Sequence, residues 1–328
     1  MAVTTYGDIS PRTAAYAVVG FLKNAMPYMC LEKFGQAQPL PSNKTMSMKW
    51  RRYNALAVRT SPLAEGVTPE SDKLTAEDVT LTLAQYGSLV EITDVIADTH
   101  EDPVLQVAIN SVAEQAAKTV ETLRYNTLKA CTNRFYANQV ASRNLVATTI
   151  TRADQRKVVR ALERQEARPI TTIVRSTPSF NTENVLPAFI AVTHVDLTSD
   201  IREMDGFINV ADYGKLSPYE TEIGACEEVR YLKSTIFTSY PGAGAATSSM
   251  INTGGLADVY PVIFFGQDAY GIVALKGKFA ITPMVLNPNV PRGGDELGQR
   301  GSVGWKTMQG TVILNDAWMA VYECCATE

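Results

Sequence analysis

"NKTMSMKWRRYNAL", residues 43–56, and "EDVTLTLAQYGSLVEITD", residues 77–94, both alternate between two kinds of side chain. One face of the first stretch carries large apolar side chains, Met46, Met48 and Trp50. A period of two is the pattern of a β-strand with one buried face. The two stretches therefore predict two long strands, joined by a loop over 59–76 that is rich in turn-forming residues.

A ribbon of two strands needs support from something else. An arm of about 15 residues extends roughly 50 Å, and an isolated two-stranded ribbon is marginally stable at best in water. We therefore expect the ribbon to lie on another subunit, which would provide much of the burial of its apolar face. The predicted subunit interface consists of six residues of the outgoing strand, Met46, Met48, Trp50, Arg51, Arg52 and Tyr53.

The plainest helical pattern covers residues 102–139. Asp102 suits the N-cap and Pro103 suits the first turn. Apolar or small side chains then recur at steps of three and four residues, from Leu105 to Cys131. A helix of this length would be a rod of about 54 Å, well beyond the average for a globular domain.

A second helix is predicted over residues 150–169, where Thr151 and Asp154 resemble a capping box. Four arginines follow one another at four-residue spacing, Arg152, Arg156, Arg160 and Arg164. Such a stripe could meet nucleic acid or an acidic neighbour. A solvated helix face is the preferred interpretation, because Asp154 and Glu163 lie close by in the sequence.

The rest of the chain mixes short strands and helices. Residues 188–194 have a strand pattern, and 196–208 begins with a helix pattern. The apolar runs 259–265 and 271–277 flank "GQDAY" as in a hairpin, and the segment after 307 is typical of paired strands. Small residues over 241–255 indicate a loop.

Composition narrows the function classes. The 328-residue chain is 45% hydrophobic and has a net charge of −4, so it can bury a sizeable core and lacks the strong positive field of a nucleic-acid reader. Its five cysteines form no CxxC pair, which indicates reduced thiols. The apolar run 14–22 is too short to span a bilayer and fits an amphipathic helix over about 11–33.

Enzyme chemistry finds little support. "GQRGSVGWKT", residues 298–307, resembles a P-loop, but Trp305 separates Gly304 from Lys306 and no helix pattern follows. The two histidines, His100 and His194, have no partner at metal-ligand spacing, and His194 fits a satisfied residue at a strand end. We expect no catalytic, cofactor or metal site. The glycines of residues 298–307 are expected to allow tight turns that lead into a strand.

The order of these elements resembles the major capsid proteins of tailed bacteriophages, which share the Hong Kong 97 fold. The motifs sharpen the resemblance to the family of the coliphage N-four major capsid protein, although Val195 replaces a usual proline. The likeness rests on seven stretches: 32–56, 62–70, 83–94, 193–203, 220–235, 258–277 and 295–327.

The resemblance implies an α+β fold with four parts. These are an N-terminal arm (1–42), an extended loop (43–97), a peripheral domain with a long spine helix (98–150 and 280–328) and an axial domain (151–279). In this fold the extended loop lies across a neighbouring subunit, and the axial domain meets its copies around hexamer and pentamer centres.

The resemblance also implies a function. The chain would assemble with itself into the icosahedral head of a virion, in the bacterial host cytoplasm and without a membrane, around double-stranded DNA that it contacts non-specifically. Scaffolding, portal and decoration proteins are implied as partners. The alternatives are an encapsulin-like shell of the same fold and an NTP-dependent enzyme that uses residues 298–307.

Overall fold

The computed structural model describes residues 29–38, 46–62, 65–66, 68–95, 104–175, 181–214, 218–273, 281–286, 288, 291 and 293–328. Most of the helix expected over 11–33 lies outside these residues, as do His100 and the expected helix start at Asp102 and Pro103. Among the described residues, no helix is both long and apolar enough to cross a bilayer.

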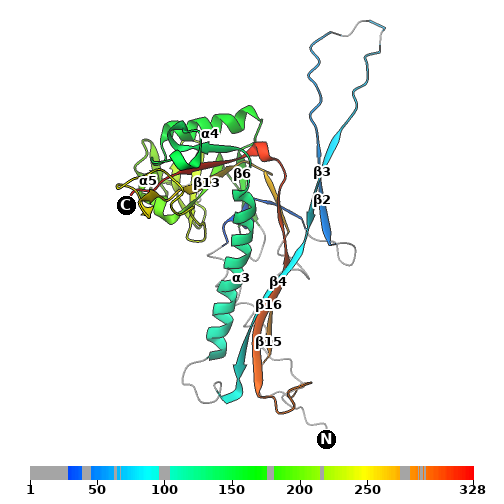
Figure 1. Cartoon of the computed structure of the whole chain (residues 1–328). Coiled ribbons are helices and arrows are strands. Elements are labelled where there is room, and N and C mark those ends of the chain that lie inside the picture. Colours follow the sequence, from blue (N-terminus) through cyan, green and yellow to red (C-terminus); the bar gives the residue numbers. More distant parts are fainter. Residues whose placement is uncertain are drawn as a thin grey trace.

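An eight-stranded sheet forms the body of the protein (Figure 1). Its main path, from edge to edge, is β5 (Arg134–Tyr136), β18 (Met319–Cys324), β13 (Tyr260–Phe265), β7 (Asn181–His194), β10 (Val229–Ser234), β9 (Glu222–Cys226) and β8 (Phe207–Asn209). The eighth strand, β6 (Ile170–Arg175), pairs with the first part of β7. The strand predicted over 188–194 is the end of β7.

Both faces of this sheet are buried, and alternate residues serve opposite faces. On one face Ala191, Phe264 and Tyr322 join a core with α4 (Arg152–Arg164) and α5 (Thr198–Arg202). The other face packs against the end of a long helix and the segment around Leu31, through Ile190, Val192, Ile263, Phe265 and Val321. All six residues of β13 and of β18 are buried for this reason.

The long helix, α3 (Val104–Lys129), joins the body to a second sheet. Its 26 residues make a rod of about 39 Å. Ile109 and Val112 in its first half pack on a three-stranded sheet, whereas Tyr125 and Leu128 near its end pack on the central sheet. The three-stranded sheet runs in the order β15 (Thr282–Leu286), β16 (Arg300–Gln309) and β4 (Ala84–Thr93).

The prediction that this helix continues to residue 139 is wrong. Helical hydrogen bonding ends at Cys131, and the Asp316 carboxylate then accepts from the backbone N–H of Thr132 at 3.2 Å. Residues 134–136 instead form β5, which pairs in parallel with β18. The aromatic residues after Cys131 therefore belong to an edge strand of the central sheet and not to the helix.

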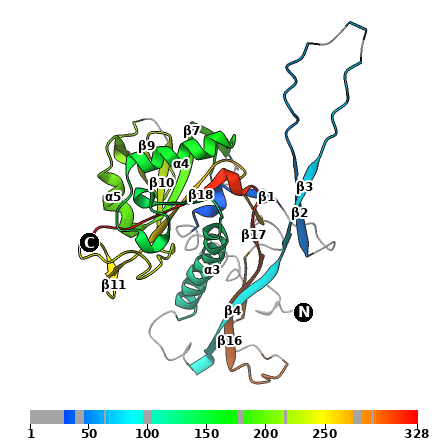
Figure 2. The same cartoon turned by 45° about the horizontal axis from the view of Figure 1, so that its top comes forward.

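The ribbon projects from the base of the second sheet, and its loop extends away from the body (Figures 1 and 2). β2 (Ser47–Tyr53) and β3 (Ala76–Thr82) are antiparallel, with Trp50 opposite Val79. The strand predicted over 77–94 breaks at Leu83. Its first part pairs with β2, and its second part, β4, pairs with β16.

The hairpin predicted from 259–265 and 271–277 is wrong. β13 lies between β18 and β7 in the central sheet. β14 (Tyr270–Val273) enters a different sheet, between β1 (Gln36–Gln38) and β17 (Thr311–Ile313). The strands predicted after residue 307 do form, but they belong to three separate sheets. Two adjacent strands in sequence need not pair when each has stronger partners elsewhere.

The remaining elements are short. The helix pattern over 196–208 becomes α5 followed by β8. The loop over 241–255 contains only half of a small hairpin, β11 (Asn252–Thr253) with β12 (Leu256–Ala257). The described residues contain 3-10 turns at Leu31–Lys33, Ala137–Gln139, Arg143–Leu145, Val195–Leu197, Val210–Asp212 and Asp316–Trp318. The expected boundaries of arm, loop, peripheral and axial domains stay predictions.

Candidate assembly ribbon

The base of the ribbon is anchored on its own subunit. Met48 and Trp50 are each 5% exposed and pack with Leu83 and Val273. The indole packs against β14, and a Cβ atom at Gly271 would come within 2.9 Å of two of its ring carbons. Because glycine has no Cβ atom, Gly271 leaves room for the tryptophan ring to pack against the strand.

A second glycine, Gly310, leaves room for a side chain of the returning strand β3. Gly310 lies between β16 and β17, and a Cβ atom there would come within 3.0 Å of the Leu81 side chain. Leu81, Val312 and Leu314 complete the small apolar cluster around Trp50. Two glycines far along the chain thus set where the ribbon leaves the body.

The expectation that a neighbouring subunit buries Met48 and Trp50 is wrong, since β14 and β17 of the same chain already cover them. The partner strands follow Met48 and Trp50 by more than 200 residues, so no local pattern could indicate them. Met46 does remain open, at 59% exposure. The indole N–H of Trp50 has no hydrogen-bond partner within the described part of the chain.

Opposite charges face each other across the ribbon. Arg51 donates to both carboxylate oxygens of Asp78, at 2.8 and 3.0 Å, and Arg52 donates to Glu77 at 2.6 Å. These residues are direct partners in the strand register. The hydrogen bond and charge of Arg51 lower the pKa of Asp78, and those of Asp78 raise the pKa of Arg51.

The ion pairs continue beyond the ladder of backbone hydrogen bonds. Asn54 still pairs with Thr75 through a backbone bond of 3.0 Å, and Arg59 then holds both carboxylate oxygens of Asp72 at 2.7 and 3.1 Å. The described residues of the loop form no strand there and are exposed. The uncovered apolar side chains are Tyr53 at the end of β2, at 58% exposure, and the loop residues Leu56 at 54%, Val58 at 88% and Leu74 at 59%.

Four of the six residues proposed for an interface are therefore accessible. Met46 and Tyr53 present exposed side chains, and Arg51 and Arg52 lie in exposed ion pairs. Their role in an interface stays a prediction. Sequence reasoning missed Arg59 and Asp72, although opposite charges on the two arms of a predicted ribbon are a signal that could have found them.

The glycines of residues 298–307 have a packing role. A Cβ atom at Gly304 would lie 2.8 Å from the carbonyl oxygen of Ser88 and 2.9 Å from the Leu89 side chain. Gly301 has a similar close approach to Pro288. The segment from Arg300 is strand β16, not the loop-to-helix turn that cradles a phosphate. The P-loop interpretation therefore lacks its structural context.

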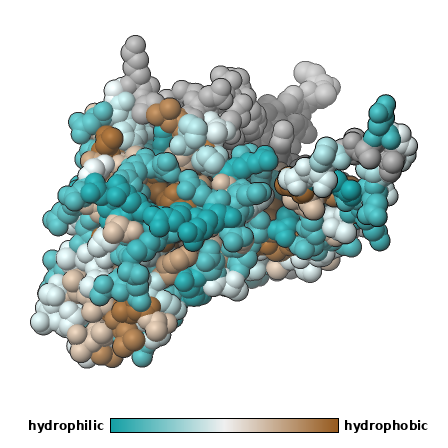
Figure 3. All heavy atoms as spheres, turned by 90° about the horizontal axis from the view of Figure 1, so that it is seen from above, coloured by the Kyte–Doolittle hydropathy of each residue, from teal (hydrophilic) through white to brown (hydrophobic). Residues whose placement is uncertain are grey.

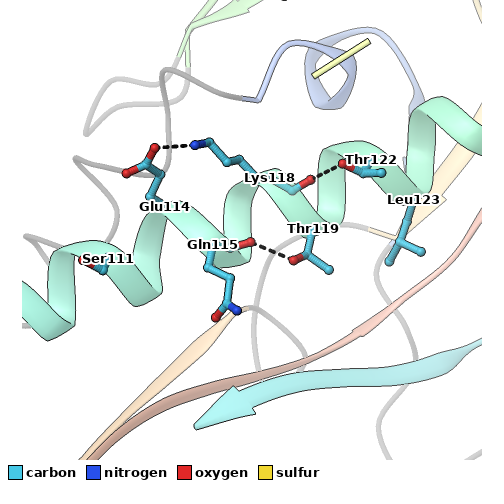
Figure 4. Close-up of a pocket in the computed structure, with 7 residues that line it drawn as sticks. All are labelled: Ser111, Glu114, Gln115, Lys118, Thr119, Thr122 and Leu123. Carbon is cyan, nitrogen blue, oxygen red and sulfur yellow. Dashed lines mark hydrogen bonds and ion pairs between the residues drawn. The ribbon is translucent and has the colours of Figure 1, made fainter. Parts of the chain in front are cut away.

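Two hollows lie along α3, and neither has catalytic geometry. The larger, about 560 Å³, is lined by the α3 residues Ser111, Glu114, Gln115, Lys118, Thr119, Thr122 and Leu123 (Figure 4). The smaller, about 190 Å³, lies at the base of the ribbon and includes Thr82, Arg124 and Gly310. In neither is a nucleophile held by a neighbouring base. Among the described residues, no group of three or more possible ligands could hold a metal ion.

The remaining candidates behave as structural residues. His194 Nδ1 accepts from the backbone N–H of Asp196 at 3.2 Å, as expected of a satisfied histidine at a strand end. The five cysteines are free and buried. On α4, Arg152 and Arg156 pair with Asp205 and Glu227, and Arg160 and Arg164 are exposed, as the solvated-face interpretation predicts.

Comparisons with known proteins add the following findings. No protein-family model matches the sequence, and no curated protein matches it. Solved structures do match. The capsid of Ralstonia phage GP4 has a TM-score of 0.67 at 11% identity and covers 91% of each chain. The capsid of Cyanophage Pam1 has a TM-score of 0.63 at 14% identity, over 93% of this chain and 92% of the other.

A third similar structure is the head of Helicobacter pylori bacteriophage KHP40. Its TM-score is 0.58 at 11% identity, over 90% of this chain and 88% of the other. Identities this low carry information about the fold. The chain has the fold of phage capsid proteins of the Hong Kong 97 type, as the sequence resemblance led us to expect.

Proposed function

We propose that this chain is the major capsid protein of a tailed bacteriophage and assembles with itself into a shell. The observation that carries the proposal is the end-to-end likeness to a phage capsid, which covers 91% of both chains. A likeness confined to one domain would leave the ribbon and long helix unexplained. Here the likeness covers about nine tenths of the chain and is not confined to one domain.

The shape supports self-assembly. The ribbon and its loop extend away from the body, so they bury little surface within one subunit (Figure 1). Exposed apolar side chains along an extended arm are typical of an interaction surface. The face seen in Figure 3 is largely hydrophilic, with small separate apolar groups. Contacts between different surfaces of identical chains generate closed rings, as hexamers and pentamers require.

The finer assignments are part of the same proposal. The sequence motifs support membership of the coliphage N-four-like family. The shell would enclose double-stranded DNA, contacted without sequence preference, and would be assembled in the host cytoplasm with scaffolding, portal and decoration proteins. We propose no enzymatic activity, because the hollows and motifs of the described residues lack a catalytic arrangement.

Electron microscopy of the purified, full-length protein tests the proposal. We expect closed icosahedral shells of uniform diameter, alone or with co-expressed phage head proteins. Particles from infected cells should be filled with double-stranded DNA, whereas cargo protein inside them would favour an encapsulin-like shell. Dispersed monomers or open filaments under all these conditions would contradict the proposal.

A further inference from the structure

Three basic side chains meet at the C-terminal end of α3. Arg134 donates to Oε1 of Glu323 at 2.6 Å, and Arg143 donates to both oxygens of the same carboxylate at 2.6 and 2.7 Å. Lys129 and Arg143 also lie over the ring of Tyr240, with the Lys129 Nζ atom 3.7 Å and the guanidinium carbon 3.6 Å from the ring centre. One carboxylate and one aromatic ring therefore hold Lys129, Arg134 and Arg143 together as a basic cluster.

The positive charge of the basic cluster exceeds the negative charge around it. Three positive groups share one carboxylate, which leaves a net charge of +2 when all four groups are ionised. The C-terminal end of a helix contributes about half a negative charge, so α3 does not cancel this excess. Burial lowers the pKa of Lys129, and the charges of Arg143 and Arg134 lower it further. Within the described part of the chain, Glu323 is the one carboxylate that opposes this effect on the Lys129 pKa.

The basic cluster is partly open to solvent and has hydrogen-bond donors left over. The side chains of Arg134 and Arg143 are 26% and 30% exposed. The Lys129 ammonium group donates to the carbonyl oxygen of Thr238 at 3.2 Å, which uses one of its three N–H groups. Arg143 uses Nε and one terminal nitrogen on Glu323, and no other described residue accepts from its second terminal nitrogen. Unused N–H donors beside an excess of positive charge suit an oxyanion.

We propose that the basic cluster binds a phosphate group, and that the DNA backbone supplies it. The Tyr240 ring and the Glu323 carboxylate hold the three cations in place before a ligand arrives, so little side-chain freedom is lost on binding. Arginine and lysine donate charge-assisted hydrogen bonds to phosphate oxygens, and such contacts carry no base-sequence information. The choice of DNA as the source rests on the proposed function, and free inorganic phosphate is the other source of the same chemistry.

The test changes one charge of the cluster and spares both arginine pairs with Glu323. Full-length Lys129→Gln removes the charge, and Lys129→Arg keeps it. Lys118→Gln is the matched control, because Lys118 lies on the same helix and pairs with Glu114 at 2.5 Å, outside the cluster. Fluorescence anisotropy measures the binding of a short mixed-sequence DNA duplex to the unassembled protein over a range of chloride concentrations. Isothermal titration calorimetry measures the binding of inorganic phosphate, and circular dichroism checks the fold of each variant.

We expect Lys129→Gln to weaken DNA binding about tenfold at low salt, since a hydrogen bond to a charged group is lost. The slope of log affinity against log salt concentration should fall by about one. Lys129→Arg should retain most of the affinity, and Lys118→Gln should match the wild type.

Other results would overturn the proposal in part or whole. Phosphate binding that is lost in Lys129→Gln, with DNA binding unchanged, would keep the phosphate site and overturn DNA as its source. Equal binding of both ligands by the wild type and Lys129→Gln would overturn the site itself. Shell formation by the wild type is scored separately in the electron microscope. Phosphate or DNA binding at the cluster without any shell would count against the proposed function and not against the site.

Discussion

The central sheet and the ribbon are both built from strands, yet they are stabilised in different ways. In the sheet, β13 and β18 are buried along their whole length and contribute to cores on both faces. In the ribbon, β3 has no buried residue and β2 has two. Burial of apolar surface therefore stabilises the body, whereas the ribbon depends on one small anchor and a row of exposed ion pairs.

The central sheet and the ribbon therefore have different roles in the subunit. A shell subunit needs a rigid body that keeps its shape and an arm whose remaining surface is available to neighbours. The cluster around Trp50 fixes the origin of the arm, and the ion pairs hold its two strands together. The following substitutions test whether the two regions really differ in this way.

The largest effect is expected in the central sheet. Phe264 is fully buried in the core beneath α4 and meets the Tyr231 ring edge to face, with centroids 6.2 Å apart. Phe264→Ala should lower the free energy of unfolding by about 3–5 kcal/mol, through lost burial and an unfilled cavity. Urea denaturation measures the loss. Phe264→Leu is the control and should cost clearly less; equal losses would point to strain rather than a cavity.

A smaller and local effect is expected at the ribbon base. Gly271→Ala places a methyl group against the Trp50 indole and should cost about 1–3 kcal/mol. Hydrogen exchange should accelerate in residues 47–53 and 76–82 and stay slow in β13. Gly293→Ala is the matched control, because a Cβ atom there meets nothing within 4 Å. Uniform acceleration across the molecule would show that the ribbon and body are not separate.

A pH-dependent effect is expected on α4. Burial by itself would raise the pKa of Asp154, but hydrogen bonds from Thr151, Lys157 and Tyr322 outweigh it and lower the pKa. A lowered pKa stabilises the fold above the ordinary carboxyl range, and the contribution is lost as pH falls through the folded-state value.

Asp154→Asn should therefore destabilise the body by about 1 kcal/mol at pH 7. The difference from the wild type should begin to shrink below about pH 4, where the carboxyl of the unfolded chain becomes protonated, and should be lost at the lower pH at which the native carboxylate, whose pKa is lowered, is protonated as well. Thermal unfolding at a series of pH values measures both. A difference that is constant down to pH 2 would mean that the charge of Asp154 contributes nothing.

The smallest effect is expected on the ribbon surface. Arg51→Ala removes a pair with Asp78 in which both side chains are well exposed, at 60% and 36%. Water already solvates such groups, so the subunit's thermal midpoint should change by less than about 2 °C. A larger fall would show that the ion pairs, and not the Trp50 cluster, hold the ribbon. Arg160→Ala provides the baseline for a surface arginine.

Local patterns were enough to predict those features that depend on neighbours within a few residues. Alternation identified β2 and β3, steps of three and four identified most of α3, and Thr151 identified the start of α4. The wrong spacing around Lys306 was enough to reject a P-loop. Each of these depends on local backbone geometry, which the chain carries with it wherever it packs.

Which of these elements meet depends on contacts between distant parts of the chain. β4 pairs with β16 and not with β2, and β13 and β14 belong to different sheets. α3 ends where the Asp316 carboxylate accepts from the backbone N–H of Thr132. Distant contacts also place Trp50 on Gly271 and bring Arg134 and Arg143 together on the fully buried Glu323. These contacts join residues 180 or more positions apart, and they form because they fill space and pair charges better than local alternatives do.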